Sequence, residues 1–368
     1  MKSVFEAMNA KDHEQVVVCN DPDTGLKAII AIHDTTIGPA LGGCRMWNYE
    51  SEDEALTDVL RLSRGMSYKA AIASLNLGGG KAVIIGDAKK QKTEILFRSF
   101  GRFVEGLNGR YITAEDVGTS VNDMEWVRME TQYVTGISRA LGGSGDPSPV
   151  TAFGAFAGLK AAVKKQLGRD EVSGLKVSVQ GVGHVGYHLV KYLCEEGAKV
   201  YVTDIFDESI KRVVDEFSVE AVGPDDIYDL DVDIYAPCAL GATLNDETIP
   251  NLKCSIVAGA ANNQLKVESE HGQMLKDRGI LYAPDYAVNA GGLINVANEI
   301  EGYNRERAFS QAESIYDILL TIFKLAEDNN IPTYKAANMV AEKRMEDISK
   351  LKNFYLPKKN FMGKRDKG

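Results

Sequence analysis

A glycine-rich turn between a predicted strand and a predicted helix constrains this chain more than any other feature. Residues 181–186 read Gly-Val-Gly-His-Val-Gly, the pattern G-x-G-x-x-G. The apolar segment 175–180 precedes the turn, and a helix is predicted over 184–196. Glycines in this context permit a tight turn, a close approach of the backbone to a pyrophosphate, and close packing of the helix on the strand. The helix N-terminus then offers free N–H groups to the phosphates.

An acidic residue further along predicts which dinucleotide would bind. Asp204 ends the next predicted strand, 198–204, and follows Gly181 by 23 residues. A carboxylate there accepts hydrogen bonds from the ribose hydroxyls and repels a 2′-phosphate, which favours NAD over NADP. The alternative is a strand–helix–strand unit that binds no nucleotide. The predicted cofactor-binding residues of this unit are Gly181, Val182, Gly183, His184, Val185, Gly186 and Asp204.

Strands and helices alternate through the second half of the chain. A helix over 150–167 precedes the glycine turn, and later strands are predicted at 232–236, 255–258 and 281–283. Such alternation indicates a parallel sheet covered on both faces. It predicts an α/β fold of the Rossmann-type, doubly wound class.

The first half of the chain predicts a separate α/β domain. It contains a predicted hairpin over 15–32, a helix over 52–66 and a short strand over 82–85 that opens after three glycines. Glycine, serine and proline then cluster at 142–149, which is typical of a domain junction. We therefore expect two domains with the active-site cleft between them. Their predicted bounds are 1–140, completed by 331–368, for the substrate-binding and oligomerisation domain and 141–330 for the nucleotide domain.

Composition limits the partners and the location of the chain. The 368 residues carry 42 basic and 52 acidic side chains, a balance that argues against binding nucleic acid or an anionic membrane. No apolar run approaches the ~18 residues of a membrane helix, and the N-terminus does not resemble a signal peptide. Five dispersed cysteines favour a reduced, cytoplasmic protein. The histidine and cysteine spacings predict no metal site.

Two lysines stand in unusual local sequences. Lys69 and Lys81 lie twelve residues apart, and Lys81 follows three glycines. They could simply be surface lysines, and a phosphate-binding loop is excluded because Ala82 stands where Ser or Thr would bind magnesium. Two ammonium groups close together in a dry cleft favour the neutral form of one of them, which could then act as a base near neutral pH.

Several further segments are distinctive, and together they are more specific than the glycine turn. They cover residues 38–45, 61–69, 77–87, 113–119, 259–263 and 289–295. With these segments the chain resembles the amino-acid dehydrogenases of the glutamate/leucine/phenylalanine/valine family over nearly its whole length. The resemblance implies that NAD is reduced while an L-amino acid is oxidised to a 2-oxo acid and ammonia.

The resemblance also implies roles for three charged residues. Lys69 would hold the substrate carboxylate, and Lys81 would be the catalytic base that activates a water molecule to attack the imine. Asp116 would carry protons to and from the substrate nitrogen. The chemistry agrees, because hydride leaves Cα only once the amine is neutral. A carboxylate that caps the following helix is the alternative for Asp116.

Uncharged residues would line the substrate side-chain pocket. Glutamate-specific relatives carry a lysine where this chain has Leu41, so glutamate is disfavoured. Leu293 stands where leucine-specific relatives carry valine, which could shrink the pocket in favour of smaller side chains. By the resemblance the substrate is a branched-chain amino acid, with leucine as the first choice. The remaining predicted substrate contacts are Gly42, Gly43, Met66, Ala114, Asn263 and Val296.

Some alternatives stay open at this point. Asn262 is expected to contact the cofactor, but Asn262 and Asn263 could exchange roles or form only an Asn-rich turn. A phenylalanine or valine dehydrogenase with the same mechanism, or a non-catalytic NAD-binding protein, would share many of these features. A 2-hydroxy-acid dehydrogenase would need a His or Arg constellation that the sequence does not suggest. By the resemblance the chain forms a homo-oligomer, as large as an octamer.

Overall fold

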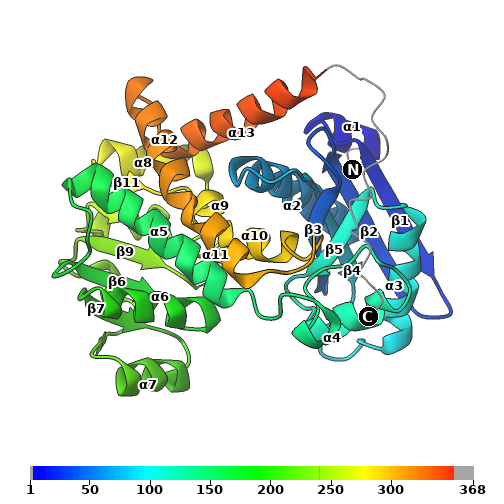
Figure 1. Cartoon of the computed structure of the whole chain (residues 1–368), viewed down its shortest axis with the longest axis horizontal. Helices are drawn as coiled ribbons and strands as arrows, with labels where there is room; N and C mark the ends of the chain where they lie inside the picture. The colour runs from blue at the N-terminus through cyan, green and yellow to red at the C-terminus, as the bar shows by residue number, and fades with distance from the viewer. Residues whose placement is uncertain (1–2, 240, 352–368) are drawn as a thin grey trace. The chain divides into compact units, whose positions relative to one another are not determined.

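The computed structural model divides the chain into two compact units (Figure 1). The structure describes residues 3–239 and 241–351. Within them, unit 1 contains residues 3–146, 296–305 and 341–351, and unit 2 contains the others. The chain first passes between the units at Asp146–Pro147, inside the segment where glycine, serine and proline cluster. Residues 296–305 belong to unit 1 and residues 331–340 to unit 2, whereas the sequence placed them the other way round.

Unit 1 is built on a mixed five-stranded sheet of order β1-β2-β4-β3-β5. The β1–β2 and β2–β4 pairs are antiparallel, and the β4–β3 and β3–β5 pairs are parallel. The strands are β1 (Gln15–Asp21), β2 (Leu26–Asp34), β3 (Ala40–Trp47), β4 (Gly78–Ile85) and β5 (Tyr111–Glu115). The helices are α1 (Val4–Asn9), α2 (Glu52–Ile72), α3 (Glu94–Gly106) and α4 (Val121–Arg128), with a 3₁₀ turn η1 (Arg139–Leu141).

Both faces of this sheet are covered, and alternate side chains of β2 pack into the two hydrophobic clusters on opposite faces. Ile30 and Ile32 pack into a cluster with Phe97 and Phe100 of α3. Ile29 and Ala31 join the opposite cluster with Val59 and Leu60 of α2. Successive side chains of a strand point to opposite faces, so one buried strand supplies both layers. The strand accordingly reads as a continuous apolar run.

The glycines of β3 and β4 lie inside strands, and β4 begins at Gly78, whereas the sequence predicted that its three glycines precede a strand over 82–85. A Cβ on Gly42 would lie 1.7 Å from the carbonyl oxygen of Gly80, and one on Gly79 would lie 2.1 Å from the backbone nitrogen of Ser67. A Cβ on Gly80 would meet the ring of Tyr111 at 2.7 Å. Strands β3 and β4 and helix α2 therefore approach one another more closely than any side chain allows.

Helix α2 is longer than the sequence suggested. Ser51 caps its N-terminus by accepting a hydrogen bond from the backbone N–H of Glu54. The helix continues past Met66 to Ile72, because Tyr68, Ala70 and Ala71 carry its buried face on toward the sheet. Lys69 consequently lies in the last turn of the helix instead of following it.

Unit 2 is built on a six-stranded parallel sheet of order β11-β10-β9-β6-β7-β8. The strands are β6 (Lys176–Gln180), β7 (Lys199–Thr203), β8 (Glu220–Ala221), β9 (Ile234–Pro237), β10 (Ile256–Val257) and β11 (Leu281–Tyr282). The order reverses beside β6, from which the chain runs first to β7 on one side and later to β9 on the other. This is the doubly wound topology predicted from the sequence, and ligands of such sheets bind where the order reverses.

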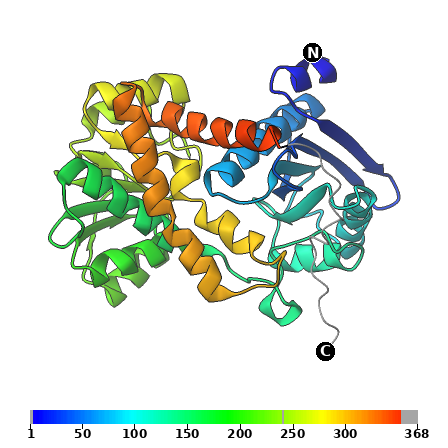
Figure 2. The ribbon, with the colours of Figure 1, turned by 45° about the horizontal axis from the view of Figure 1, so that its top comes forward.

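The helices of unit 2 cover its sheet, and α12 runs beside α5 in both ribbon views (Figures 1 and 2). Gly154 and Gly158 of α5 permit this contact, because Cβ atoms there would lie 2.6 Å from Ile315 and Leu319 of α12. The remaining helices of the chain are α5 (Ser148–Leu167), α6 (His184–Glu195), α7 (Asp207–Glu216), α8 (Glu268–Asp277), α9 (Asp285–Val288), α10 (Gly291–Ala297), α11 (Arg305–Glu313), α12 (Ile315–Asp328) and α13 (Thr333–Ser349), with 3₁₀ turns η2 (Asp226–Tyr228) and η3 (Ile249–Asn251).

None of the helices described between residues 3 and 351 combines the length and the apolar character that a membrane crossing requires.

Candidate active site

Three charged side chains meet where the parallel strands of unit 1 lie side by side. Lys81 projects from β4, Arg45 from β3, and Asp116 directly follows β5. The Nζ atom of Lys81 lies 3.0 Å from Oδ1 of Asp116, and Nε of Arg45 lies 2.9 Å from Oδ2. Each oxygen of the Asp116 carboxylate thus contacts a different cation. The structure brings together the two residues that the sequence proposed as catalytic.

Burial and charge act on Asp116 in opposite directions. Burial raises the pKa of its carboxyl group, but the nearby charges of Lys81 and Arg45 lower it, and the net pKa lies below the ordinary value. The carboxylate is therefore ionised at neutral pH. Lys81 is only 5% exposed, so its ammonium group depends on Asp116 to compensate the loss of hydration.

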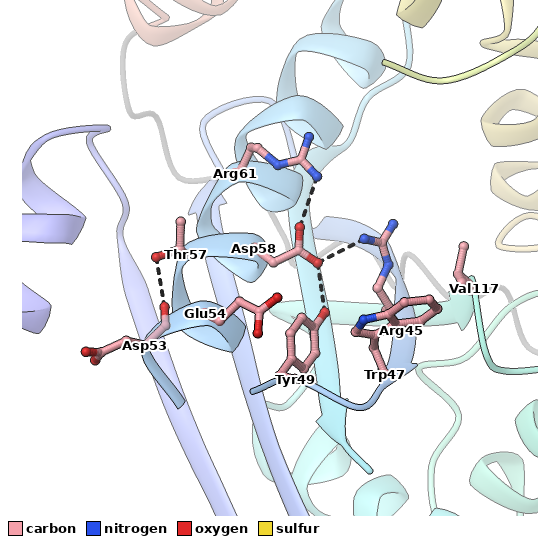
Figure 3. A pocket seen from close by; sticks show the side chains of 9 residues that line it. All are labelled: Arg45, Trp47, Tyr49, Asp53, Glu54, Thr57, Asp58, Arg61 and Val117. Atoms are coloured by element: carbon pink, nitrogen blue, oxygen red, sulfur yellow. Dashed lines mark hydrogen bonds and ion pairs between the residues drawn. The ribbon is translucent and has the colours of Figure 1, made fainter. Parts of the chain in front are cut away.

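Arg45 connects this pair to a second set of polar residues. Its Nη1 atom donates to Oδ2 of Asp58 at 2.9 Å, and the same oxygen accepts a 2.7 Å hydrogen bond from the Tyr49 hydroxyl. Oδ1 of Asp58 accepts from Arg61 at 3.0 Å. These residues line a pocket of about 630 Å³ beside α2, where Figure 3 shows Asp58 between Tyr49, Arg45 and Arg61.

No role was predicted for Arg45 from the sequence, although its position in β3 relates it to Asp116. A Cβ on Gly43 would lie 2.9 Å from Cβ of Asp116, so Gly43 faces that residue. Arg45 is two residues further along the same strand and therefore points to the same side of the sheet. The period of two, applied to β3, would have directed Arg45 toward Asp116.

The residues predicted to contact substrate within unit 1 lie on β3, α2 and β5. Gly42 and Gly43 pair with Thr113 and Ala114 of β5, and a Cβ on Gly42 would lie 3.2 Å from Cγ of Met66. Leu41 is 1% exposed and Ala114 6%. Lys69 is partly buried, three residues after Met66 on the same helix.

The two predicted pocket residues late in the chain lie on α10. Leu293 and Val296 are three residues apart, so they share one side of that helix, and both are buried. Because both side chains are apolar, this side of α10 carries no charge that would bind a substrate side-chain carboxylate.

The glycine turn of unit 2 is tight and is open on one side. Gly181 has a φ of +93°, and a Cβ on Gly186 would lie 2.0 Å from the carbonyl oxygen of Gly181. A Cβ on Gly183 would meet nothing within 4 Å, so the space beside it is open. Gly183 is also the N-cap of α6, whose first residues, His184 and Val185, are exposed and partly exposed. The exposed end of a twelve-residue helix therefore faces solvent with its free N–H groups.

Asp204 lies beside this turn at the end of β7. Its Oδ2 atom accepts a 2.8 Å hydrogen bond from the backbone N–H of Val182, and Oδ1 accepts one from Phe206 at 3.0 Å. The side chain is partly exposed. A carboxylate oxygen has more than one acceptor direction, so these bonds leave Asp204 able to accept from ribose hydroxyls.

The structure distinguishes the two adjacent asparagines. Asn262 is exposed, and its Oδ1 atom accepts a 2.7 Å hydrogen bond from Nδ2 of Asn289, which is buried. Asn263 is also exposed and adopts a left-handed backbone with a φ of +50°. Asn262 is thus held in place with its amide N–H groups directed to donate, whereas Asn263 occupies a turn position that suits asparagine.

Comparison with known proteins covers nearly the whole chain. The family profile described as "Glu/Leu/Phe/Val dehydrogenase, dimerisation domain" matches residues 13–133. The profile described as "Glutamate/Leucine/Phenylalanine/Valine dehydrogenase" matches residues 142–209 and 202–352. A leucine dehydrogenase from Thermoactinomyces intermedius is 60% identical over 353 residues, which is 96% of each chain.

Two further relatives are named for aromatic amino acids. A phenylalanine dehydrogenase from Caldalkalibacillus thermarum is 50% identical over 351 residues, 94% of this chain and 95% of that one. The crystal structure of L-tryptophan dehydrogenase from Nostoc punctiforme superposes with a TM-score of 0.85 at 48% identity, over 95% of this chain and 100% of the other. The sequence identity of this chain is thus higher with the relative named for leucine than with those named for aromatic amino acids.

Proposed function

Because the chain belongs to the glutamate/leucine/phenylalanine/valine family of amino-acid dehydrogenases, as its motifs predicted, we propose that it oxidises branched-chain L-amino acids, leucine first, to the 2-oxo acid and ammonia with NAD. The observation that carries this proposal is the pair formed by Lys81 and Asp116, a buried cation 3.0 Å from a partly buried anion beside two glycines of β3.

The residues of unit 1 divide the steps of the reaction among them. Lys69 holds the substrate carboxylate by its positive charge. Asp116 is ionised, so it can take a proton from the substrate ammonium group and leave the amine neutral. When NAD is bound it supplies the acceptor for the hydride that leaves Cα.

Hydrolysis of the resulting iminium then needs a base and a positioned water molecule. Lys81 and Asp116 form one hydrogen-bonded pair, so a proton can pass between them. Lys81 first releases its proton to solvent, and its neutral amine then takes a proton from water as the oxygen attacks the iminium carbon, while Asp116 returns a proton to the nitrogen as ammonia leaves. Atoms balance, since one water enters and one ammonia departs.

The residues of unit 2 fit a dinucleotide. The open space beside Gly183 would admit a pyrophosphate, and the N-terminus of α6 would carry favourable partial charge for it. Asp204 would accept from the ribose hydroxyls and disfavour a 2′-phosphate, which supports NAD over NADP. Asn262, oriented by Asn289, is the asparagine that we assign to the cofactor, and Asn263 is assigned to substrate.

The experiment that tests this function is a substrate panel. Reduction of NAD is followed with leucine, isoleucine, valine, phenylalanine and glutamate in parallel, and leucine is repeated with NADP. We expect the highest kcat/KM with leucine and NAD. Glutamate as the best substrate would refute the argument from Leu41, and no turnover with any of the five would refute the enzyme itself.

We further propose a homo-oligomer in the cytoplasm whose partners are small molecules only. The match of residues 13–133 to a profile described as a dimerisation domain supports self-association. Light scattering on the purified protein gives the number of subunits, and a mass equal to one chain would contradict this proposal. An octamer stays a prediction from the family resemblance.

A further inference from the structure

We propose that Arg45 is a positioning residue that holds the Asp116 carboxylate with Oδ1 toward Lys81, and that Asp58 and Tyr49 hold Arg45 in turn. This inference rests on the proposed function, because it concerns the carboxylate to which that function assigns proton transfer. We assign Arg45 an action through Asp116, so its effect on the reaction is indirect.

The contacts of Asp116 leave its side chain dependent on Arg45. The backbone of Asp116 is fixed locally, since its N–H donates to Oγ1 of Thr119 at 2.9 Å and that hydroxyl lies 2.8 Å from the carbonyl oxygen of Cys44. The carboxylate itself is held at Oδ1 by Lys81 and at Oδ2 by Nε of Arg45. Without Arg45, one half of this clamp is lost and the side chain, 23% exposed, is able to rotate.

Arg45 is itself fixed from the opposite side. Its Nη1 atom lies 2.9 Å from Oδ2 of Asp58, whose side chain is 15% exposed, and the Tyr49 hydroxyl fixes that same oxygen at 2.7 Å. A guanidinium group is planar and directs Nε and Nη1 to two separate acceptors at once. A lysine ammonium has no such rigid fork, so it would not hold both carboxylates in this geometry.

The charges around Asp116 also indicate that its carboxylate depends on Arg45. Arg45 is shared by two largely buried carboxylates, Asp116 and Asp58, so its removal takes away one of the two cations that form ion pairs with Asp116 in the described residues. The pKa of Asp116 would then rise from its lowered value, because burial acts against the ionised form. Other titratable groups that interact with Asp116 include Cys44, Tyr49, Tyr111 and Glu115. None of these four can supply a replacement cation.

The test compares Arg45→Gln and Arg45→Lys with wild-type enzyme in leucine oxidation. We expect kcat to fall about 10- to 100-fold in both variants, a part of the ~10²–10⁴-fold effect of a proton-transfer group. The acid limb of the kcat/KM profile should move to higher pH, and KM for NAD should change less than twofold. A kcat within twofold of wild type together with an unmoved acid limb would overturn the proposal.

The test includes a control for the loss of an arginine that bridges two carboxylates and a second variant that can be used if Arg45→Gln does not fold. Arg98 likewise bridges two carboxylates, Glu94 and Glu130, so Arg98→Gln should reduce stability without moving the pH profile. If Arg45→Gln does not fold, Asp58→Asn provides the answer, because it frees Arg45 and leaves the Arg45–Asp116 contact in place. We expect Asp58→Asn to lower kcat several-fold because Arg45 loses its outer anchor, and the acid limb to stay in place or move to lower pH because a negative charge is removed. An unchanged kcat would overturn the proposal.

One further variant separates this inference from the proposed function. Asp116→Asn removes the carboxylate itself and should abolish turnover. If Asp116→Asn is inactive while Arg45→Gln behaves like wild type, the positioning role is wrong and the proposed function stands. If Asp116→Asn keeps wild-type activity, the role assigned to Asp116 is wrong, and with it the inference about Arg45.

Discussion

The carboxylate of Asp204 accepts a hydrogen bond from the backbone N–H of Val182, 2.8 Å away, and so connects the end of β7 to the glycine turn that follows β6. This contact gives Asp204 two tasks in the proposed site. It fixes the turn before any nucleotide arrives, and it presents a negative charge where the ribose of a dinucleotide would lie. The two tasks can be separated by substitution.

Asp204→Ala should reduce the preference for NAD over NADP and also weaken NAD binding. The charge that repels a 2′-phosphate is lost, and so is one hydrogen bond to the turn, which is worth about 0.5–1.5 kcal/mol. We expect the ratio of kcat/KM for NAD to that for NADP to fall about tenfold or more. Asp204→Asn is the matched variant, because its amide oxygen still accepts from Val182 while the charge is absent. An unchanged ratio in both variants would mean that another residue reads the ribose.

Lys81→Ala should remove turnover while leaving dinucleotide binding intact. The lysine lies in unit 1 and the glycine turn in unit 2, so the two functions are located in different parts of the chain. We expect kcat for leucine to fall about 10²- to 10⁴-fold, and the dissociation constant of NADH, measured by fluorescence, to stay within twofold.

Lys92→Ala is the control for a buried ion pair in the same unit. Lys92 contacts Asp123 at 2.5 Å, and Asp123 is almost fully buried. Its loss should lower the melting temperature and leave kcat near the wild-type value. Lys81→Ala with normal activity would refute its assignment as the base.

The sequence predicted unit 2 more completely than unit 1 because its signals are local. The glycine turn, the strand before it and the helix after it lie within about twenty residues, and each element has a conventional pattern. Strand β3 was missed because Leu41, Gly42 and Gly43 do not alternate between polar and apolar residues. The need for glycine arises there from backbone atoms of β4 and β5, which are distant in sequence.

In the candidate site, too, contacts between residues distant in the sequence were the hardest to predict. Lys81 and Asp116 were identified through family motifs, which carry information on residues that meet in space. Arg45 contacts Asp58 across 13 residues and Asp116 across 71, and no local pattern specifies either partner. Only the strand period of two points to Arg45, and that period can be applied only once β3 is known.

Two buried histidines should make the stability of unit 1 depend on pH. His13 and His33 pack edge to face with their ring centroids 4.8 Å apart and bond to Ser63 and Ser67 of α2. Burial lowers the pKa of each histidine to about 4. The unfolded chain binds protons near pH 6.5 and the folded chain does not, so stability is full above about pH 6.5 and is lost as the pH falls toward 4.

Urea unfolding at several pH values between 7 and 4.5 measures this effect. We expect the free energy of unfolding to fall by on the order of 2 kcal/mol for each histidine over that range. His33→Asn should lower stability at pH 7 and flatten its dependence on pH, whereas His184→Gln, at an exposed position, should keep the wild-type slope. An equal slope in the wild type and His33→Asn would show that other groups cause the acid sensitivity.

Leu293→Val should shift substrate preference toward larger side chains. Leu293 is 6% exposed on α10 and is one of the residues proposed to line the side-chain pocket. Removing one methylene from that wall leaves more room for the substrate. A hydrophobic pocket distinguishes substrates that differ by one methylene by about 10- to 200-fold in kcat/KM. We expect the ratio of kcat/KM for leucine to that for valine to rise about three- to tenfold, with KM for NAD unchanged. Leu265→Val, in the separate core of unit 2 around Tyr235, controls for a general loss of packing. A leucine-to-valine ratio that moves equally in both variants, or in neither, would remove Leu293 from the pocket.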